Sequence, residues 1–152
     1  MRIGILPSAG RATRLNGLPK FLLPVSEDVQ CLLDWHVQLM QPHVDRIIIP
    51  TRPEWKGLLD DFSFGPDVEI LSMETETMAQ TLRQSLDSAS FDSCVLGMPD
   101  TFFVGGNPYQ GLLDGKWGAL SQSALETALR DTSPRFGDLR PLIGRFAKEV
   151  VD

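Results

Sequence analysis

The sequence has few residues of the types that hold metals through sulfur and nitrogen. Its 152 residues include two cysteines, Cys31 and Cys94, and two histidines, His36 and His43. Neither pair has the spacing of a zinc site, and two cysteines make no disulfide framework. We therefore expect no structural zinc. We expect Cys94 to be a small core residue, and both histidines to lie at a helix surface or a helix end.

Long apolar runs are also absent. No run approaches the roughly 18–20 residues that a membrane span needs, and residues 1–7 are typical of a strand rather than of a signal peptide. We therefore expect a cytoplasmic protein without a membrane partner. With 42% hydrophobic and 22% charged residues, the chain is suited to a single globular domain over residues 1–152.

Negative charge dominates the chain, whose formal net charge is −6. This balance argues against nucleic acid as a partner. The distribution is uneven, because residues 1–26 contain four basic residues and no acidic one, whereas the remainder contains ten basic and twenty acidic residues. A basic segment in an acidic chain indicates either a local anion site or chance clustering.

Apolar runs alternate with amphipathic stretches along the first hundred residues. The expected strands are 2–7, 46–50, 68–71 and 93–97, and the expected helices are 32–40, 54–62 and 76–89. This alternation predicts an α/β fold with a parallel sheet and right-handed crossovers. Ligands of such sheets bind beyond the carboxyl ends of the strands. Since Ser8 and Asp100 both follow expected strands, we expect them at one edge of the sheet.

The pattern changes after Phe103. Residues 104–117 are rich in Gly and Pro and show no clear periodicity, and two helices are expected to follow. Ser123 and Glu126 form a capping-box pattern at the start of the first. Asp138 is expected to cap the second.

The segment from Leu6 to Val25 carries the clearest functional signal. It reads Leu-Pro-Ser-Ala-Gly-Arg-Ala-Thr-Arg-Leu and then, after three residues, Pro-Lys-Phe-Leu-Leu-Pro-Val. Small residues let backbone amides approach a phosphate closely, and Thr13, Arg14 and Lys20 add a hydroxyl, a planar fork and a compact charge. The segment is neither a P-loop nor a dinucleotide-binding fingerprint, because it contains no Gly-Lys-Ser/Thr and no G-x-G-x-x-G.

This double motif resembles the signature of the sugar-phosphate nucleotidylyltransferases. The signature reads approximately L-A-G-G-x-G-T-R-L followed by P-K-x-L-L-P-V, and Ala12 stands where it usually has Gly. The resemblance implies a Rossmann-like three-layer α/β sandwich with a mostly parallel sheet, of the nucleotide-diphospho-sugar transferase type. It also implies transfer of a nucleotidyl group from a nucleoside triphosphate to a sugar 1-phosphate, with release of pyrophosphate and with Mg²⁺ as cofactor.

The resemblance further implies roles for individual residues. Arg14 and Lys20 are the implied catalytic residues, Arg14 holding the leaving phosphates and Lys20 neutralising charge near the α-phosphate. Asp100, in Gly-Met-Pro-Asp-Thr, is the implied magnesium ligand. Residues 74–82 stand where the family has a segment that contacts the base and its sugar. The implied nucleotide-binding residues are Ser8, Ala9, Gly10, Arg11, Ala12, Thr13 and Met78.

The second half of the chain matches the family less completely. Residues 1–103 correspond to the nucleotide-binding half, whereas residues 104–152 resemble a shortened sugar-binding part in which the Trp-Gly-Ala segment at Trp117 comes early. A second lysine for the sugar phosphate and a second metal-binding aspartate have no clear counterpart.

Three interpretations therefore stay open. The first is an active enzyme, with glucose 1-phosphate and either dTTP or UTP as the first choice of substrates. The second is a reduced, non-catalytic nucleotide-binding or regulatory module. The third is an interaction domain that uses neither ligand. A homo-oligomer is left open in each case.

Overall fold

Strands and helices alternate along the chain. The computed structural model describes residues 1–11, 17–102, 107, 109–110 and 120–121. The strands are β1 (Arg2–Ile5), β2 (Arg46–Thr51), β3 (Val68–Ser72), β4 (Ser93–Leu96) and β5 (Leu120–Ser121). The helices are α1 (Leu32–Met40), α2 (Pro53–Asp60) and α3 (Met78–Asp87), with two short 3₁₀ helices, η1 (Lys20–Leu22) and η2 (Gln41–His43).

All the strands and helices expected from the first hundred residues are present, and each begins and ends within a few residues of its expected position. The helices expected after Ser123 and Asp138 lie outside the described residues. Within the described part of the chain, no helix is long and apolar enough to cross a membrane.

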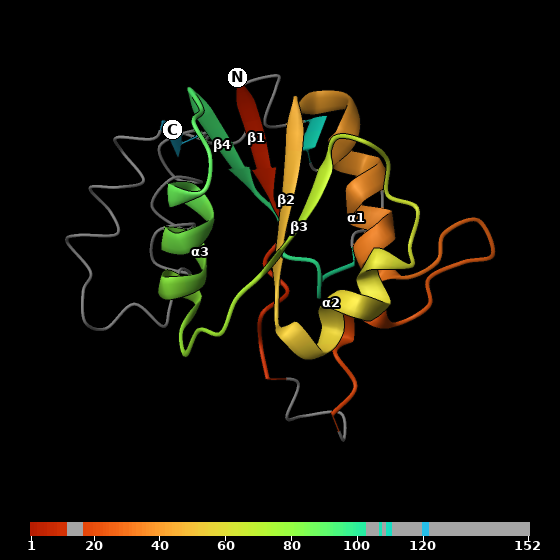
Figure 1. Ribbon diagram of the computed structural model, residues 1–152. Coiled ribbons are helices and arrows are strands. Elements are labelled where there is room, and N and C mark those ends of the chain that lie inside the picture. Colours follow the sequence, from red (N-terminus) through yellow and green to blue (C-terminus); the bar gives the residue numbers. More distant parts are fainter. Residues whose placement is uncertain (12–16, 103–106, 108, 111–119, 122–152) are drawn as a thin grey trace, which may run out of the picture.

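The strands form one sheet in the order β3-β2-β1-β4-β5. β1 pairs in parallel with β2 and with β4, and β2 pairs in parallel with β3. The short strand β5 is antiparallel to β4. The expected α/β fold with a mostly parallel sheet is therefore confirmed. Since the four parallel strands point the same way, their carboxyl ends meet at the lower edge in Figure 1.

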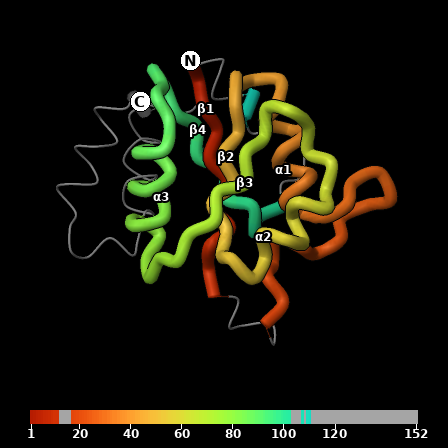
Figure 2. Tube along the Cα trace, in the orientation of Figure 1, coloured from red at the N-terminus to blue at the C-terminus, as the bar shows by residue number. Residues whose placement is uncertain are grey.

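Helices cover both faces of the sheet, with α1 and α2 on one face and α3 on the other (Figures 1 and 2). The three isoleucines of β2 show how the sequence produces this arrangement. Ile47 and Ile49 pack into the core cluster beneath α1 and α2, whereas Ile48 packs with Leu82 and Leu86 of α3. Successive strand side chains point to opposite faces, so a continuous apolar run fills two cores. The expected three-layer sandwich is confirmed.

Helix α3 begins two residues later than expected because a capping box defines its start. The Thr77 hydroxyl accepts from the Gln80 amide at 3.2 Å, and the Gln80 side chain accepts from the Thr77 amide at 3.3 Å. The same Gln80 oxygen accepts from the amide of Glu76 at 2.8 Å. This exchange satisfies amides that the helix leaves without partners. It also fixes the loop between β3 and α3 at the carboxyl edge of the sheet.

Candidate functional site

The order of the strands identifies where a ligand fits. The chain passes from β1 outward to β2 and β3, and then returns to place β4 on the other side of β1. The topological switch point therefore lies between β1 and β4, and doubly wound sheets bind their ligands at such a point. The loop after β1 contains the double motif, and the loop after β4 contains Asp100. The structure thus confirms that these two segments leave neighbouring strands at one edge.

The loop after β1 stays attached to the sheet as far as Ser8. The backbone amide of Ser8 donates to the Pro50 carbonyl at 2.8 Å, and the Ser8 carbonyl accepts from the Thr51 hydroxyl at 3.1 Å. The Ser8 hydroxyl donates to the Leu6 carbonyl at 3.2 Å. Ser8 and Ala9 are buried, whereas Gly10 is exposed. Ser8 and Ala9 therefore form the base of the loop, and the chain reaches solvent at Gly10.

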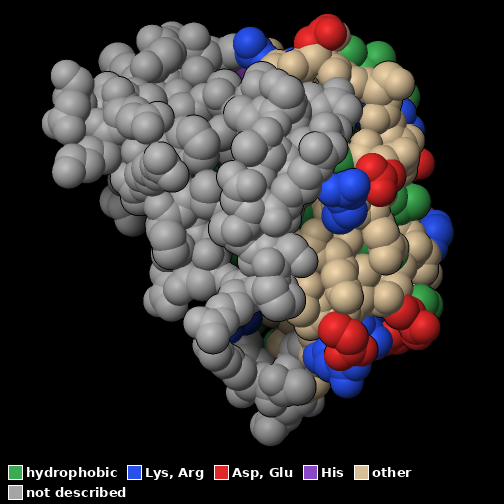
Figure 3. Space-filling model, turned by 90° about the vertical axis from the view of Figure 1, so that its left-hand side faces the viewer, with side chains coloured by type: hydrophobic (Ala, Val, Ile, Leu, Met, Phe, Trp, Pro, Cys, Tyr) green, Lys and Arg blue, Asp and Glu red, His purple; other side chains and the backbone are tan. Residues whose placement is uncertain are grey.

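Arg11 connects this loop to the loop between β3 and α3. Its guanidinium donates to the carboxylate of Glu76, and both side chains are largely exposed. Figure 3 shows acidic and basic side chains beside one another elsewhere on the described surface too. The loop that the sequence assigns to phosphate binding and the segment that it assigns to the base therefore lie together.

Met78, the first residue of α3, belongs to that second segment. Its side chain is half-buried and packs against the core cluster that contains Leu82 and Leu86. Its role in nucleotide binding stays a prediction.

The second part of the double motif is anchored by its neighbours. Pro19 and Phe21 are buried on either side of Lys20, which is exposed at the start of η1. The amide of Leu23 donates to the Lys20 carbonyl at 3.0 Å. The backbone of Lys20 is thus held while its ammonium group reaches solvent. Ala12, Thr13 and Arg14 lie outside the described residues, so their roles stay predictions.

Asp100 occupies a turn directly after β4. The turn is closed by the Thr101 amide, which donates to the Met98 carbonyl at 3.1 Å, and by the Thr101 hydroxyl, which donates to the same carbonyl at 2.6 Å. Pro99 is buried in this turn, and Asp100 is exposed. The turn therefore presents one carboxylate at the edge, next to the loop after β1.

His36 corrects an expectation from the sequence. It is fully buried rather than at a helix surface. Its Nε2 lies 2.7 Å from the Thr101 carbonyl, and its Nδ1 lies 2.7 Å from the Tyr109 hydroxyl. Burial lowers the pKa of His36, while the hydrogen bond to Thr101 and the charge of Asp100 oppose that shift. His43, by contrast, lies at the end of η2 as expected.

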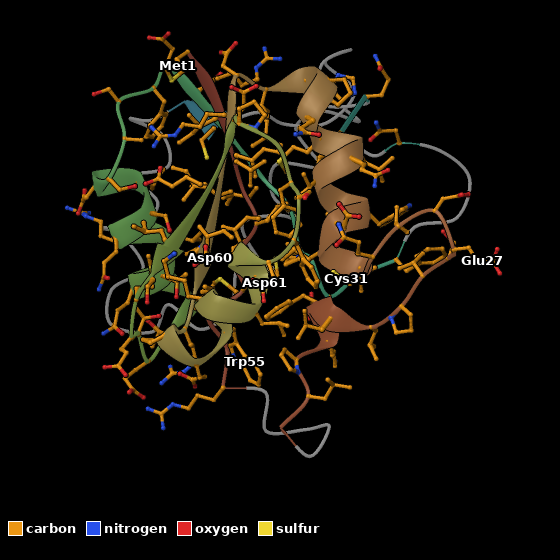
Figure 4. The ribbon with its side chains drawn as sticks, turned by 45° about the vertical axis from the view of Figure 1, so that its right-hand side comes forward. Met1, Glu27, Cys31, Trp55, Asp60 and Asp61 are labelled. Atoms are coloured by element: carbon orange, nitrogen blue, oxygen red, sulfur yellow. The ribbon has the colours of Figure 1, made fainter. Side chains whose placement is uncertain are left out.

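Arg52 is a residue of this edge that the sequence did not indicate. It follows β2 directly, and only 12% of its side chain is exposed. Its Nε donates to the Glu54 carboxylate at 2.9 Å, while its buried Nη1 has no hydrogen-bond partner among the described residues. The pKa of Glu54 is lowered by a backbone hydrogen bond, by the Arg52 bond, and by the charges of Arg52 and Arg11. Trp55, in the first turn of α2, lies at the opposite end of the molecule from Met1 (Figure 4).

The described residues can hold a divalent metal only if a bound ligand supplies further oxygen donors. Among them, no group of three or more His, Cys, Asp or Glu side chains is placed to hold a metal ion. Asp100 supplies one exposed carboxylate at the strand end. Magnesium is commonly held by one or two carboxylates together with substrate phosphates. The donor set therefore suits a metal that arrives with a nucleotide.

Comparison with protein-family models gives no match, and comparison with curated protein sequences gives none either. Solved structures do resemble the chain. A nucleotidyl transferase from Methanothermobacter thermautotrophicus aligns with a TM-score of 0.70 and 19% identity, over 98% of this chain and 83% of its own. Rv0371c from Mycobacterium tuberculosis aligns with a TM-score of 0.67 and 18% identity, over 85% of this chain and 75% of its own.

A third structure extends the comparison to sugar phosphates. A protein from Bacillus anthracis described as a glucose-1-phosphate thymidylyltransferase aligns with a TM-score of 0.59 and 25% identity. The match covers 78% of this chain and 52% of that one, so this chain spans about half of its length. Rv0371c is also known in complex with manganese, and that structure aligns with a TM-score of 0.57 and 17% identity over 90% of this chain and 77% of its own. The resemblance found in the sequence is thus confirmed as a shared fold.

Proposed function

We propose that this protein transfers a nucleotidyl group from a nucleoside triphosphate to a sugar 1-phosphate. One observation carries the proposal. The segment that resembles the nucleotidylyltransferase signature and the strand-end Asp100 leave the two strands that flank the switch point. The shared fold supports this proposal, and the family signature supplies the substrate class.

In the proposed reaction, an oxygen of the sugar phosphate attacks the α-phosphorus of the nucleotide. A new phosphorus–oxygen bond forms, and the bond to the bridging oxygen breaks, so pyrophosphate leaves. The attacking phosphate is already ionised near neutral pH, and no general base is needed. Positioning and charge neutralisation then account for most of the rate enhancement.

The chain's own residues divide this task. Backbone amides around Gly10 face the phosphates, and Arg14 holds the leaving pyrophosphate. Lys20 neutralises charge near the α-phosphate. Asp100 holds Mg²⁺ or Mn²⁺ through oxygen, and the metal, when bound, neutralises phosphate charge.

Arg11 can also bind phosphate, provided that it leaves its ion pair with Glu76. An exposed ion pair contributes about 0–1 kcal/mol, so Glu76 holds Arg11 only weakly before the nucleotide binds. A triphosphate competes for the same guanidinium with more charge and more oxygens. Arg11 therefore exchanges Glu76 for phosphate when the nucleotide binds.

Glucose 1-phosphate with dTTP or UTP remains the first choice of substrates, on the strength of the sequence resemblance. The proposal keeps the cytoplasm as the expected location and leaves a homo-oligomer open. A second candidate is a reduced module that binds nucleotide without catalysis. It is motivated by the second half of the sequence, where a second lysine for the sugar phosphate and a second metal-binding aspartate have no clear counterpart.

A thermal-shift panel followed by an assay of pyrophosphate release separates the two candidates. Each nucleoside triphosphate is tested with and without Mg²⁺ and Mn²⁺. Binding to the folded state at a hundredfold excess over Kd stabilises it by about 2.7 kcal/mol. A nucleotide-selective shift with pyrophosphate release supports the enzyme, and a shift without release supports the module. No shift with any nucleotide contradicts both.

Matched variants assign the site. Lys20→Ala should lower turnover at least about a hundredfold if Lys20 stabilises transition-state charge, whereas Lys56→Ala should not. Lys56 is a suitable control because it pairs with Asp60 on α2. Likewise, Asp100→Asn should abolish the response to metal, and Asp61→Asn, at the exposed end of α2, should leave it unchanged.

A further inference from the structure

A buried chain of hydrogen bonds runs from Tyr109 through His36 to the turn that contains Asp100. The Tyr109 hydroxyl and the Thr101 carbonyl each lie 2.7 Å from a ring nitrogen of His36. Tyr109 is buried, at 4% exposed, and His36 is completely buried. Neither residue belongs to the double motif.

The partners of His36 determine where its protons lie. The Thr101 carbonyl can only accept, so Nε2 of His36 carries the proton and donates it. In the neutral imidazole Nδ1 then has a lone pair, to which the Tyr109 hydroxyl donates. Each ring nitrogen is satisfied with the imidazole neutral. The orientation of the ring is therefore fixed from both sides.

Helix α1 holds two consecutive residues after Asp100. His36 binds the carbonyl of Thr101, and its neighbour Trp35 stacks on Phe102 with ring centroids 4.9 Å apart and planes 29° apart. The amide and hydroxyl of the same Thr101 close the turn onto Met98. The turn around Asp100 is thus tied both to Met98, two residues after β4, and to α1.

We propose that His36 and Tyr109 are positioning residues for the carboxylate of Asp100, which they direct toward a divalent cation bound with nucleotide phosphates. This inference rests on the proposed function, because that function makes Asp100 the metal ligand. Groups that orient a metal ligand through hydrogen bonds commonly affect metal affinity by 10–100-fold. The contact here is with the carbonyl of the residue after the ligand, so we expect an effect of about tenfold.

Two substitutions of His36 by an amide side chain each keep one of its two hydrogen bonds and remove the other. In His36→Gln the side-chain nitrogen takes the place of Nε2 and can still donate to Thr101. In His36→Asn the shorter side chain takes the place of Nδ1 and cannot reach Thr101. Both variants bury an amide, so the cost of burying a polar group is common to both, and a difference in metal response reports the bond to Thr101.

The first measurement is the Mn²⁺ concentration that gives half of the thermal stabilisation by dTTP. We expect His36→Asn to raise it about tenfold, and His36→Gln, which keeps the bond to Thr101 and loses the one to Tyr109, to raise it less. The stabilisation by dTTP without metal should not change in either variant. Equal midpoints in the two variants, or no change in His36→Asn, would overturn the positioning role.

The second measurement does not depend on the proposed function. Hydrogen exchange at the Thr101 amide, followed by NMR, reports opening of the turn. Loss of one hydrogen bond should speed this exchange about tenfold in His36→Asn, and should also speed it in Tyr109→Phe, which removes one oxygen only. Unchanged exchange in both variants would contradict the proposal directly.

Asp100→Asn distinguishes the two possible failures. If Asp100→Asn leaves the Mn²⁺ midpoint unchanged while His36→Asn speeds exchange at Thr101, His36 orders the turn but the assignment of the metal site is wrong. If Asp100→Asn abolishes the Mn²⁺ response and His36→Asn does not move it, the metal site stands and the positioning role is wrong.

Discussion

At the scale of single residues, burial keeps several titratable side chains of the core uncharged. It raises the pKa of the Cys94 thiol to about 12, as expected for a small core residue. It also raises the pKa of Tyr109 and lowers that of His36. All three side chains are therefore neutral near pH 7. The charged groups at this edge include the exposed Arg11 and Asp100 and the largely buried Arg52.

The lowered pKa of His36 predicts how stability depends on pH. The unfolded chain binds a proton at His36 below its ordinary value of 6.5, whereas the folded chain does so only at a lower pH. Between the two values the unfolded state binds more protons, so the free energy of unfolding decreases as pH falls. Below the pKa of His36 in the folded state, the free energy of unfolding no longer changes through His36, because both states then bind the proton.

Urea unfolding of the wild type and of His36→Gln between pH 7.5 and 4.5 tests this dependence. Because other groups titrate over the same range, the informative quantity is the difference between the two slopes. The wild type should lose more stability on acidification. Parallel curves would contradict a buried neutral His36.

A second prediction at this scale concerns Gly97, which follows β4. A Cβ at this position would overlap the Tyr109 hydroxyl and a Leu6 methyl group. We expect Gly97→Ala to destabilise the fold by about 1–3 kcal/mol through overpacking. Gly57 is the matched control, because it lies inside α2 with no atom within 4 Å of a Cβ.

Gly57→Ala should instead stabilise the protein, since alanine favours a helix by about 1 kcal/mol over glycine. Denaturant unfolding of the two variants gives both values. Effects of the same sign would contradict this account of the packing around Tyr109.

At the scale of elements, the sequence predicted what depends on local pattern. The strands and helices follow from apolar periodicity, and their confirmed positions agree with that physics. The burial of His36 also had a sequence signal. It shares one face of α1 with Leu33, Val37 and Met40, all of which are buried. The polarity of histidine favours the surface, but the position of His36 on this apolar face favours burial.

Contacts between distant segments could not be predicted in this way. The ion pair of Arg11 with Glu76 and the bond of His36 to Tyr109 join residues 65 and 73 positions apart. No periodicity encodes such a pairing, which depends on the crossing of elements in space. The expected roles of Arg14, Lys20 and Asp100 came from a motif and not from geometry, and they stay predictions.

The capping box of α3 leads to a prediction at the scale of one element. Thr77→Ala removes the acceptor of the Gln80 amide and should destabilise the protein by about 0.5–2 kcal/mol. Ser90→Ala is the control, because Ser90 is exposed and follows the helix without a side-chain bond among the described residues. Chemical denaturation measures both. A cost no greater than that of Ser90→Ala would show that the box does not stabilise α3.

At the scale of the whole molecule, the candidate site is assembled from segments that the sheet brings to one edge. The loop after β1 supplies Gly10 and Arg11, the loop after β3 supplies Glu76, and the turn after β4 supplies Asp100. No single segment holds more than part of the site. The order of the strands therefore determines which segments meet at the candidate site.

The last prediction tests that assembly through the contact between two of these loops. Glu76→Gln breaks the ion pair with Arg11 and leaves the guanidinium free for phosphate. Because the exposed pair contributes at most about 1 kcal/mol, nucleotide affinity should rise by no more than about fivefold. The gain should shrink as salt is added, since salt screens the pair in the wild type. Glu69→Gln is the control, because it breaks the comparable pair with Arg46 between strands β2 and β3. Isothermal titration with a nucleoside triphosphate at low and high salt measures both variants. A loss of affinity in Glu76→Gln alone would mean that Glu76 orders Arg11 for the ligand rather than competing with it.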